Sequence, residues 1–339
     1  SNFLVHGVDI DQEVVKTINS GKVHFTEPQL EVLVKEVVKK NKLKASTKPD
    51  FSDVFIIAVP TPFKKNKSAI PEPNIEYVLS AAKSIAPYLR EGNLVIIEST
   101  SPVGTTEKVN LLLKNSIKFK IDKLHICYCP ERVIPGNIIN ELVANNRVVG
   151  GLKKEDGELA KSFYKTFCNG DVSITNSKTA ELVKLTENTF RDINIAFANE
   201  LSIICDHIDV NDRELIDLAN QHPRVNILQP GCGVGGHCIA IDPWFLASIL
   251  PKYTTLIQAG RKVNNYKVVW VANKIKEEVN YLKQKKNEET YVGCLGLSFK
   301  PNVDDVRESP AKLIVDELIK SGLNILVCEP NLKKIDGLD

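Results

Sequence analysis

The sequence contains no methionine and only two tryptophans among its 339 residues. No apolar run reaches the roughly 18 residues that a membrane-spanning helix needs, and no N-terminal stretch has the pattern of a signal peptide. Net charge is small, at +2, and acidic and basic residues are interleaved. The sequence therefore predicts no membrane span, no nucleic-acid partner and a cytoplasmic location. The absence of methionine and the opening Ser1-Asn2, which resembles the scar of a cleaved tag, indicate that residues have been left out of the numbering. We therefore treat separations between residues as lower bounds.

Cysteine is scattered along the chain rather than clustered. The eight thiols form no tight framework of the kind that staples small secreted proteins. Cys127-x-Cys129 has the wrong spacing for a zinc knuckle, and no paired histidine motif completes such a site. We therefore expect reduced thiols, as in a cytosolic enzyme, and no metal.

The first half of the chain alternates between strand and helix patterns. Composition is that of an ordinary globular protein, with 43% hydrophobic and 25% charged residues. Residues 53–59 and 94–97 are continuous apolar runs, which are typical of parallel strands that helices cover on both faces. This alternation predicts a doubly wound α/β domain that closes near residue 175.

Two long helical patterns follow, over residues 178–205 and 254–282. A new strand-helix-strand pattern begins at Tyr291, with its helix over 311–321 and its second strand over 324–328. A helix as long as the second one normally spans or joins domains. We therefore predict an α/β fold in which a helical domain joins two Rossmann-like domains, with both ends of the chain truncated. The predicted domains are 1–175, 176–288 and 289–339.

Asp9 ends the first predicted strand. In a nucleotide-binding βαβ unit, the acid that ends the second strand holds the adenosine ribose. An equally good interpretation from the residues alone is that Asp9 caps the helix predicted over residues 12–18. The strand and Gly-x-Gly-x-x-Gly turn that should precede it are not in the sequence.

A glycine-rich stretch, Gly231-Cys-Gly-Val-Gly-Gly-His-Cys238-Ile-Ala-Ile-Asp242, concentrates chemically useful groups. Its glycines allow a tight curl whose N–H groups could bind an oxyanion. If a helix starts near Cys238, the thiol and the Asp242 carboxylate share one face, and the helix N-terminus lowers the thiol pKa. Two other interpretations are a dinucleotide fingerprint, which we reject because no strand precedes it, and a loop with a structural cysteine.

Three further features are weak when taken alone. Lys184 and Asn188 share a helix face at i, i+4, which usually means a solvated face. Glu131 after Pro130 is most simply a loop acid, and the Asp304-Asp305-Val-Arg307 segment is most simply an exposed charge cluster.

Together these segments resemble the UDP-glucose/GDP-mannose dehydrogenase family. The resemblance rests on Gly-Val-Gly-Gly-His-Cys-Ile-Ala-Ile-Asp, on Ala-Glu-x-x-Lys-x-x-Glu-Asn around Lys184, on Ser-Thr-x-Pro-Val-Gly-Thr around Thr100, and on Pro-Glu-Arg around Glu131. It covers nearly the whole chain. It implies NAD as cofactor, a UDP-sugar as substrate, a dimer interface built by the long helix predicted over residues 254–282, and a homodimer or homotetramer.

The resemblance also implies roles for individual residues. Cys238 would capture an aldehyde, Asp242 and Thr100 would hold a catalytic water, and Glu131 would serve thioester hydrolysis. The implied catalytic residues are Cys238, Lys184, Asn188, Asp242, Glu131 and Thr100. The implied cofactor-binding residues are Asp9, Thr61, Thr100 and Arg307. The implied substrate-binding residues are Lys184, Asn188, Arg261, Gly235, Gly236 and Lys300.

The implied reaction is the four-electron oxidation of a sugar C6 hydroxyl to a carboxylate. Many UDP-glucose-specific relatives carry a lysine before the aspartate, whereas this chain has Ile241 after Ala240. An apolar wall there favours a sugar with an N-acetyl group, so we expect UDP-N-acetylmannosamine as substrate. UDP-N-acetylglucosamine, UDP-glucose and a catalytically silent sugar-binding protein stay open. Cys232 stands where many relatives carry proline.

Overall fold

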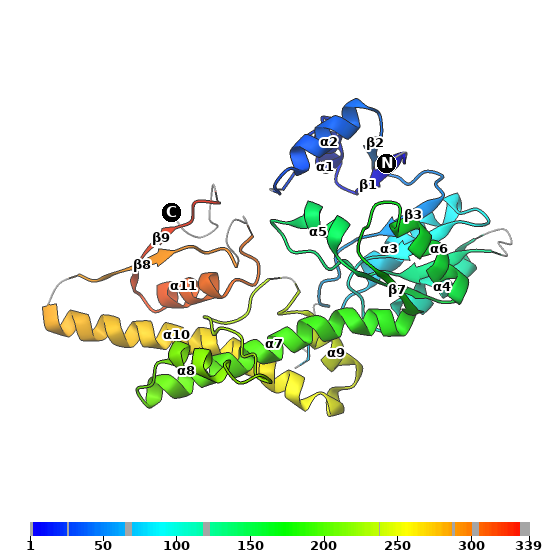
Figure 1. Ribbon diagram of the computed structural model, residues 1–339. Helices are drawn as coiled ribbons and strands as arrows, with labels where there is room; N and C mark the ends of the chain where they lie inside the picture. Colours follow the sequence, from blue (N-terminus) through cyan, green and yellow to red (C-terminus); the bar gives the residue numbers. More distant parts are fainter. Residues whose placement is uncertain are drawn as a thin grey trace. The chain divides into compact units, whose positions relative to one another are not determined.

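The computed structural model describes residues 3–25, 27–64, 70–117, 123–236, 238–286, 289–299 and 305–332. The chain divides into two compact units, Ser1–Leu185 and Thr186–Asp339. Figure 1 shows the elements of each unit along the chain. In the described part of the chain, no helix combines the length and the apolar character that a membrane crossing requires.

A five-stranded sheet forms the centre of the first unit, in the order β3-β4-β5-β6-β7. All neighbours are parallel except β5 and β6, which are antiparallel. The strands are β3 (Val54–Ile57), β4 (Leu94–Ile97), β5 (His125–Tyr128), β6 (Arg147–Gly151) and β7 (Val172–Asn176). Every residue of β4 is buried, as the apolar run over 94–97 predicts for a strand covered on both faces.

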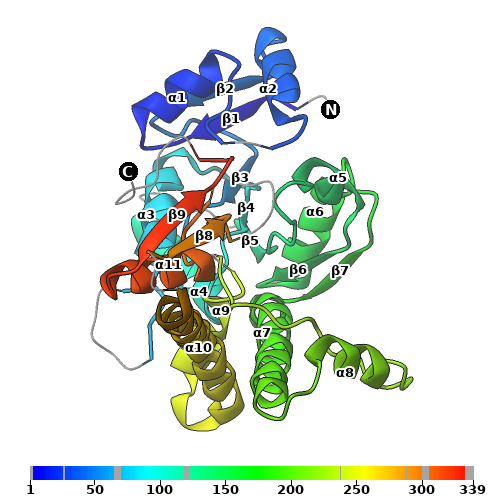
Figure 2. The same cartoon turned by 90° about the vertical axis from the view of Figure 1, so that its left-hand side faces the viewer.

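Helices pack on both faces of this sheet. Val95 and Ile97 of β4 belong to a core with α3 (Glu76–Ile85) and α4 (Thr105–Ser116). The alternate residues, Leu94 and Ile96, belong to a second core with α6 (Lys154–Tyr164). In Figure 2, α3 lies on one side of β4 and α6 on the other. The predicted doubly wound α/β architecture is therefore confirmed.

A separate two-stranded parallel sheet pairs β1 (Val5–Val8) with β2 (Leu43–Ser46). It carries α1 (Gln12–Asn19) and α2 (Leu30–Lys39). In the described residues this sheet is separate from the five-stranded one. The Glu27 carboxylate accepts hydrogen bonds from the N–H groups of Gly136 and Ile138, both 2.8 Å, and so joins this layer to the N-terminus of α5 (Ile138–Ala144).

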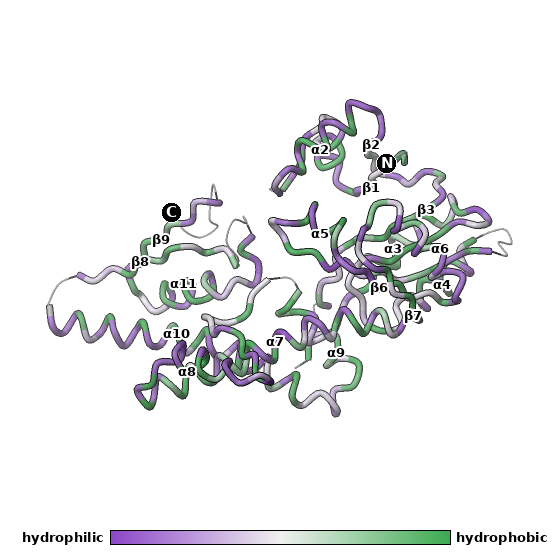
Figure 3. The backbone as a smooth tube through the Cα atoms, viewed as in Figure 1, coloured by the Kyte–Doolittle hydropathy of each residue, from purple (hydrophilic) through white to green (hydrophobic). Residues whose placement is uncertain are grey.

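Two long helices dominate the second unit. One is α7 (Ser177–His207), which begins in the first unit, and the other is α10 (Thr255–Lys286). Short helices α8 (Asp212–Ala219) and α9 (Asp242–Ile249) connect them. Figure 3 shows mostly hydrophilic residues on the end of α10 nearest residue 286.

The chain then forms a parallel βαβ unit from β8 (Tyr291–Leu295), α11 (Pro310–Lys320) and β9 (Asn324–Cys328). Ile314 and Leu318 of α11 pack on Ala272 of α10, which fixes this unit against the long helix. Strand β9 has the predicted bounds. The three-domain division at 175 and 288 stays a prediction.

One strand and two α-helices were not predicted: β2, α8 and α5. Strand β2 reads Leu-Lys-Ala-Ser, which has little strand pattern, and it exists because it pairs with β1. Helix α8 carries a signal that sequence reasoning missed. Asn211 accepts from the N–H groups of Arg213 and Glu214, an N-cap with an acid at the third helical position.

Candidate active site

The carboxyl ends of β1, β3 and β4 carry the predicted cofactor residues Asp9, Thr61 and Thr100. The Asp9 carboxylate accepts from the N–H of Asp11 at 2.9 Å. Asp11, not Asp9, caps α1, because its own carboxylate accepts from the N–H of Glu13. The capping interpretation of Asp9 is therefore wrong. A strand-end carboxylate outside the helix cap fits the ribose of a dinucleotide.

The loops after β3 and β4 are tied together at this edge. The Thr61 hydroxyl donates to the Thr100 carbonyl at 2.7 Å, and the N–H of Val59 donates to the Ser99 hydroxyl at 2.8 Å. Ligands of open α/β sheets bind outside the carboxyl ends of the strands. Thr61 and Thr100 thus lie at the sheet edge where a nicotinamide cofactor is expected to bind.

Glu181 fixes the start of α7 to this edge. Its carboxylate accepts from the Gly104 N–H at 2.6 Å and from the Thr106 N–H and hydroxyl at 2.8 and 2.6 Å. A carboxylate at these positions satisfies free N–H groups at the N-terminus of α4. Lys184, one turn further along α7, is buried with 8% of its surface exposed. The Glu181 contacts therefore hold the helix turn that carries Lys184.

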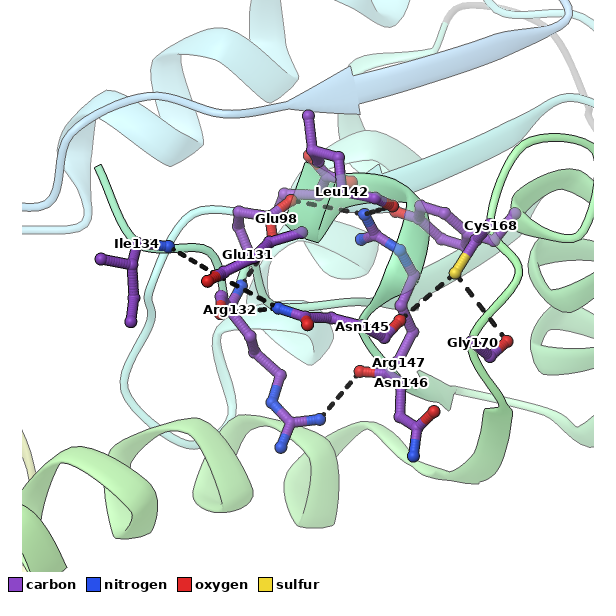
Figure 4. Close-up of polar contacts among 12 residues, drawn as sticks. Glu98, Glu131, Arg132, Ile134, Leu142, Asn145, Asn146, Arg147, Cys168 and Gly170 are labelled. Carbon is purple, nitrogen blue, oxygen red and sulfur yellow. Dashed lines mark hydrogen bonds and ion pairs between the residues drawn. The ribbon is translucent and has the colours of Figure 1, made fainter. Parts of the chain in front are cut away.

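Glu131 lies in a polar cluster beyond the end of β5 (Figure 4). Its Oε2 is 3.5 Å from Nη2 of Arg147, and its Oε1 accepts from the Arg132 N–H at 2.6 Å. Behind this pair, the Tyr164 hydroxyl donates to Glu98 Oε1 at 2.5 Å. Burial raises the pKa of Glu98, and burial raises the pKa of the Cys129 thiol to about 12.

The raised pKa of Glu98 predicts a pH-dependent stability. Because the folded protein holds this proton to a higher pH than the unfolded chain, the free energy of unfolding falls as pH rises through that interval. Glu98→Gln cannot titrate, so its stability relative to the wild type should rise with pH from the ordinary carboxyl range upward. Urea unfolding followed by circular dichroism at several pH values measures this difference. A difference that does not change with pH would contradict the prediction.

In the second unit, the glycine stretch is held to α7 at both ends. The N–H of Gly231 donates to Asn199 Oδ1 at 2.8 Å. Asn188 Nδ2 donates to Asp242 Oδ2 at 2.5 Å, with both side chains buried. Residues 188 and 199 are three helical turns apart and share one face of α7. Asn188 and Asp242, predicted as site residues from separate motifs, are brought together directly.

Cys238 precedes a helix rather than beginning one. The sequence suggested a helix start near Cys238, but residues 238–241 form a turn and α9 begins at Asp242. The Cys238 carbonyl accepts from the N–H groups of Ile241 and Asp242 at 3.1 and 2.9 Å. Asp242, the first residue of α9, is buried and accepts the hydrogen bond from Asn188. The Cys238 side chain is exposed, and so is that of Cys232.

Buried polar side chains form a stripe on α7 that continues beyond the predicted pair. After Lys184 and Asn188 come Asp192 and Asn199, both with 0% exposed surface. Asn264 Nδ2 on α10 donates to Asp192 Oδ1 at 2.8 Å, and Asn199 Nδ2 donates to Asn264 Oδ1 at 2.9 Å. The signal that would have found Asp192 and Asn199 is the continued spacing of polar residues on one helix face.

Arg261, predicted to bind substrate, is also part of this network. Its Nη1 donates to Asp192 Oδ1 at 2.6 Å, its Nη2 donates to Asn265 Oδ1 at 2.7 Å, and 3% of its surface is exposed. The guanidinium therefore joins α10 to α7 through a hydrogen-bonded ion pair. Its contact with substrate stays a prediction.

The glycines of the stretch approach protein atoms closely. A Cβ on Gly235 would lie 2.5 Å from the Glu308 carbonyl oxygen and from Pro310 Cδ. At Gly236, whose φ is +86°, it would lie 2.9 Å from the Phe299 ring. Arg307 in the same segment is exposed and pairs with Asp305 through Nε and Nη2, at 2.8 and 2.7 Å. Lys300, also predicted to bind substrate, lies outside the described residues.

We expect Gly235→Ala to destabilise the second unit by about 1–3 kcal/mol, the usual cost of overpacking. The matched control is Gly231→Ala, because a Cβ there would meet its nearest atom at 3.7 Å. Both tryptophans of the chain, Trp244 and Trp270, belong to the second unit. Urea unfolding followed by tryptophan fluorescence therefore reports on this unit, and equal midpoints for the two variants would contradict the prediction.

The predicted catalytic residues divide between the two units. Thr100, Glu131 and Lys184 belong to the first, and Asn188, Cys238 and Asp242 belong to the second. Within the first unit, the described contacts place Thr100 at the edge of the sheet and Glu131 beside Arg147. Within the second unit, they join Asn188 to Asp242.

Comparison with known proteins accounts for all three parts of the chain. Residues 1–168 match the NAD binding domain of the UDP-glucose/GDP-mannose dehydrogenase family, residues 178–266 its central domain, and residues 293–337 its UDP binding domain.

The similar proteins include the UDP-N-acetyl-D-mannosamine dehydrogenase of Campylobacter jejuni, 51% identical over 98% of this chain and 82% of the relative. The NDP-N-acetyl-D-galactosaminuronic acid dehydrogenase of Ralstonia nicotianae is 48% identical over 97% of this chain and 78% of the relative. The solved UDP-D-ManNAc dehydrogenase of Pyrococcus horikoshii superposes with a TM-score of 0.90 at 39% identity, covering 98% of this chain and 79% of that one. The chain therefore belongs to the UDP-glucose/GDP-mannose dehydrogenase family and is an NAD-dependent oxidoreductase that acts on a UDP-sugar.

Proposed function

We propose that the protein oxidises the C6 hydroxyl of UDP-N-acetyl-D-mannosamine to the carboxylate, giving UDP-N-acetyl-D-mannosaminuronate and two NADH. The observation that carries this proposal is the buried hydrogen bond between Asn188 and Asp242, one turn beyond the exposed Cys238 thiol. It brings the amide of Asn188, from α7, against the acid that lies four residues after the Cys238 thiol. The identity of 51% to the Campylobacter jejuni enzyme supports the choice of sugar.

In the first half of the proposed reaction, the alcohol becomes an aldehyde. Asp242 and Thr100 position a water that takes the proton of the C6 hydroxyl. Lys184 and Asn188 stabilise negative charge on the C6 oxygen, as preorganised donors do. Bound NAD supplies the hydride acceptor for both oxidations. Asp9, Thr61, Thr100 and Arg307 would hold it.

In the second half, Cys238 prevents the aldehyde from escaping. Its sulfur bonds to C6 and forms a thiohemiacetal, which becomes a thioester when a second hydride leaves. Glu131 then takes a proton from the water that attacks the thioester carbon. The carbon–sulfur bond breaks, the carboxylate product is released, and the Cys238 thiolate is regenerated.

NADH formation from a panel of UDP-sugars tests this proposal. We expect the highest kcat/KM with UDP-N-acetylmannosamine and two NADH per sugar. A second candidate is an N-acetylgalactosamine nucleotide, because the Ralstonia nicotianae relative is 48% identical. A higher kcat/KM for UDP-glucose would contradict the choice of an N-acetyl sugar. Sugar binding without any NADH would indicate a silent binding protein.

We also propose that the protein is a cytoplasmic homo-oligomer that pairs through α7. Phe190, Phe197 and Ile204 follow one another at seven-residue spacing and have 65%, 50% and 49% of their surface exposed. Such a stripe on a long helix is typical of a seam that another helix covers. Sedimentation equilibrium tests the proposal, and a monomer mass at micromolar concentration would contradict it.

A further inference from the structure

Arg147 is a buried guanidinium whose position is fixed mainly by aromatic rings. It begins β6, and only 5% of its side chain is exposed. Its guanidinium carbon lies 4.6 Å from the centre of the Tyr164 ring and 5.9 Å from that of the Phe167 ring. Nη2 donates to the Leu142 carbonyl at 3.4 Å, whereas Nε and Nη1 have no hydrogen-bond partner. The Tyr164 and Phe167 rings therefore contact the Arg147 guanidinium, whereas two of its N–H-bearing nitrogens make no hydrogen bond.

Strand pairing places Glu131 opposite Arg147. Strands β5 and β6 are antiparallel, and Tyr128 pairs with Gly150. Continuing the same register beyond the end of β5 brings Glu131 to the position across from Arg147, where side chains lie on one face. The ion pair agrees with this register, since Nη2 and Oε2 are 3.5 Å apart. In Figure 4 a dashed line joins the two side chains.

Burial disfavours a negative charge on the other polar groups of this cluster. Burial raises the pKa of Glu98, of Cys129 and of Tyr164. A buried cation without a counter-charge is strongly unfavourable, and the ion pair supplies the Glu131 carboxylate as a counter-charge for Arg147. Glu131 has 32% of its side chain exposed. It can therefore reach a water molecule while Arg147 stays buried.

We propose that Arg147 is a positioning residue for thioester hydrolysis: it holds the Glu131 carboxylate at the carboxyl end of β5. This rests on the proposed function, in which Glu131 takes a proton from the attacking water. In that step a water oxygen bonds to the acyl carbon, the carbon–sulfur bond breaks, and no electrons pass to an oxidant. Loss of Arg147 should therefore slow hydrolysis and spare both hydride transfers.

The experiment combines stopped-flow NADH formation with intact-mass spectra of the full-length enzyme during turnover. Arg147→Gln should give a burst that approaches two NADH per active site at a near wild-type rate. Steady turnover should then be about 10²-fold slower, the scale expected from misplacing a catalytic group. A covalent sugar adduct should accumulate on the protein. Arg90→Gln is the matched control, because Arg90 also stacks on an aromatic ring, 4.1 Å from the centre of Phe51, and it should behave as the wild type.

Arg147→Lys keeps the charge and loses the planar fork, so it decides the question if Arg147→Gln does not fold. It should also accumulate the adduct, with a smaller loss of steady turnover. Wild-type steady turnover in Arg147→Lys, or an equal slowing of burst and steady phases, would overturn the proposal. Glu131→Gln tests the proposed thioester hydrolysis independently of Arg147. If neither Glu131→Gln nor the Arg147 variants accumulate an adduct, the thioester route itself fails.

Discussion

Replacing Cys238 with serine should lower overall turnover by at least about 10³-fold, the scale lost when a covalent nucleophile is removed. The Cys238 side chain is exposed, and the Cys238 carbonyl accepts from the N–H groups of Ile241 and Asp242 in the turn that leads into α9. Serine keeps that backbone contact, so affinities for NAD and for the UDP-sugar should stay near the wild-type values. A serine adduct would also stall, because an ester hydrolyses more slowly than a thioester. NADH release and intact-mass spectra during turnover measure both effects.

Cys232→Ser is the matched control, since Cys232 lies in the same stretch and is also exposed. It should cost less than about tenfold, which corresponds to about 1.4 kcal/mol. The structure sharpens the contrast: Cys232 follows Gly231, which is anchored to Asn199, whereas Cys238 leads into Asp242 and its hydrogen bond to Asn188. Equal losses in the two variants, or an adduct mapped to Cys232, would overturn the assignment of Cys238.

Replacing Asp192 with asparagine should destabilise the second unit by about 3–5 kcal/mol, the cost of leaving one partner of a buried ion pair alone. Arg261 Nη1 lies 2.6 Å from Asp192 Oδ1, and the two side chains have 4% and 0% exposed surface. Asparagine has nearly the same shape, so the loss reports the charge rather than a cavity. It would also weaken the contact that Asn264 makes with Oδ1.

Asp206→Asn is the control for this prediction. Asp206 and Lys274 also join α7 to α10, at 2.7 Å, but their side chains are 35% and 44% exposed. Solvent screens such pairs, so little change is expected. Urea unfolding followed by the fluorescence of Trp244 and Trp270 compares the variants within the second unit. If Asp206→Asn lowered the midpoint as much as Asp192→Asn, burial would not be the cause.

Local pattern was enough to find most of the elements. Strand β4 and strand β9 have the predicted bounds, and α7 covers the predicted helical segment around Lys184 and Asn188. These elements bury apolar residues at the period of their own backbone, so their signal lies within a few residues. The family resemblance was equally local, because each motif stays within one loop or one helix turn.

The tertiary structure decided which distant residues contact one another. The antiparallel pairing of β5 with β6 sets Arg147 opposite Glu131, and no pattern around either residue indicates it. The sequence suggested a helix start near Cys238, whereas α9 begins at Asp242, whose side chain meets that of Asn188, far away in sequence. Each outcome depends on groups that meet only after the chain has folded.

The sequence by itself therefore determined the fold class, the helix face that carries Lys184 and Asn188, and the candidate thiol at Cys238. Only the tertiary structure showed that Asp192, Asn199 and Arg261 form one buried network between α7 and α10. The physical reason is that a polar side chain looks the same in sequence whether water or another side chain satisfies it. Burial, which makes an unpaired group costly, exists only once distant segments have packed together.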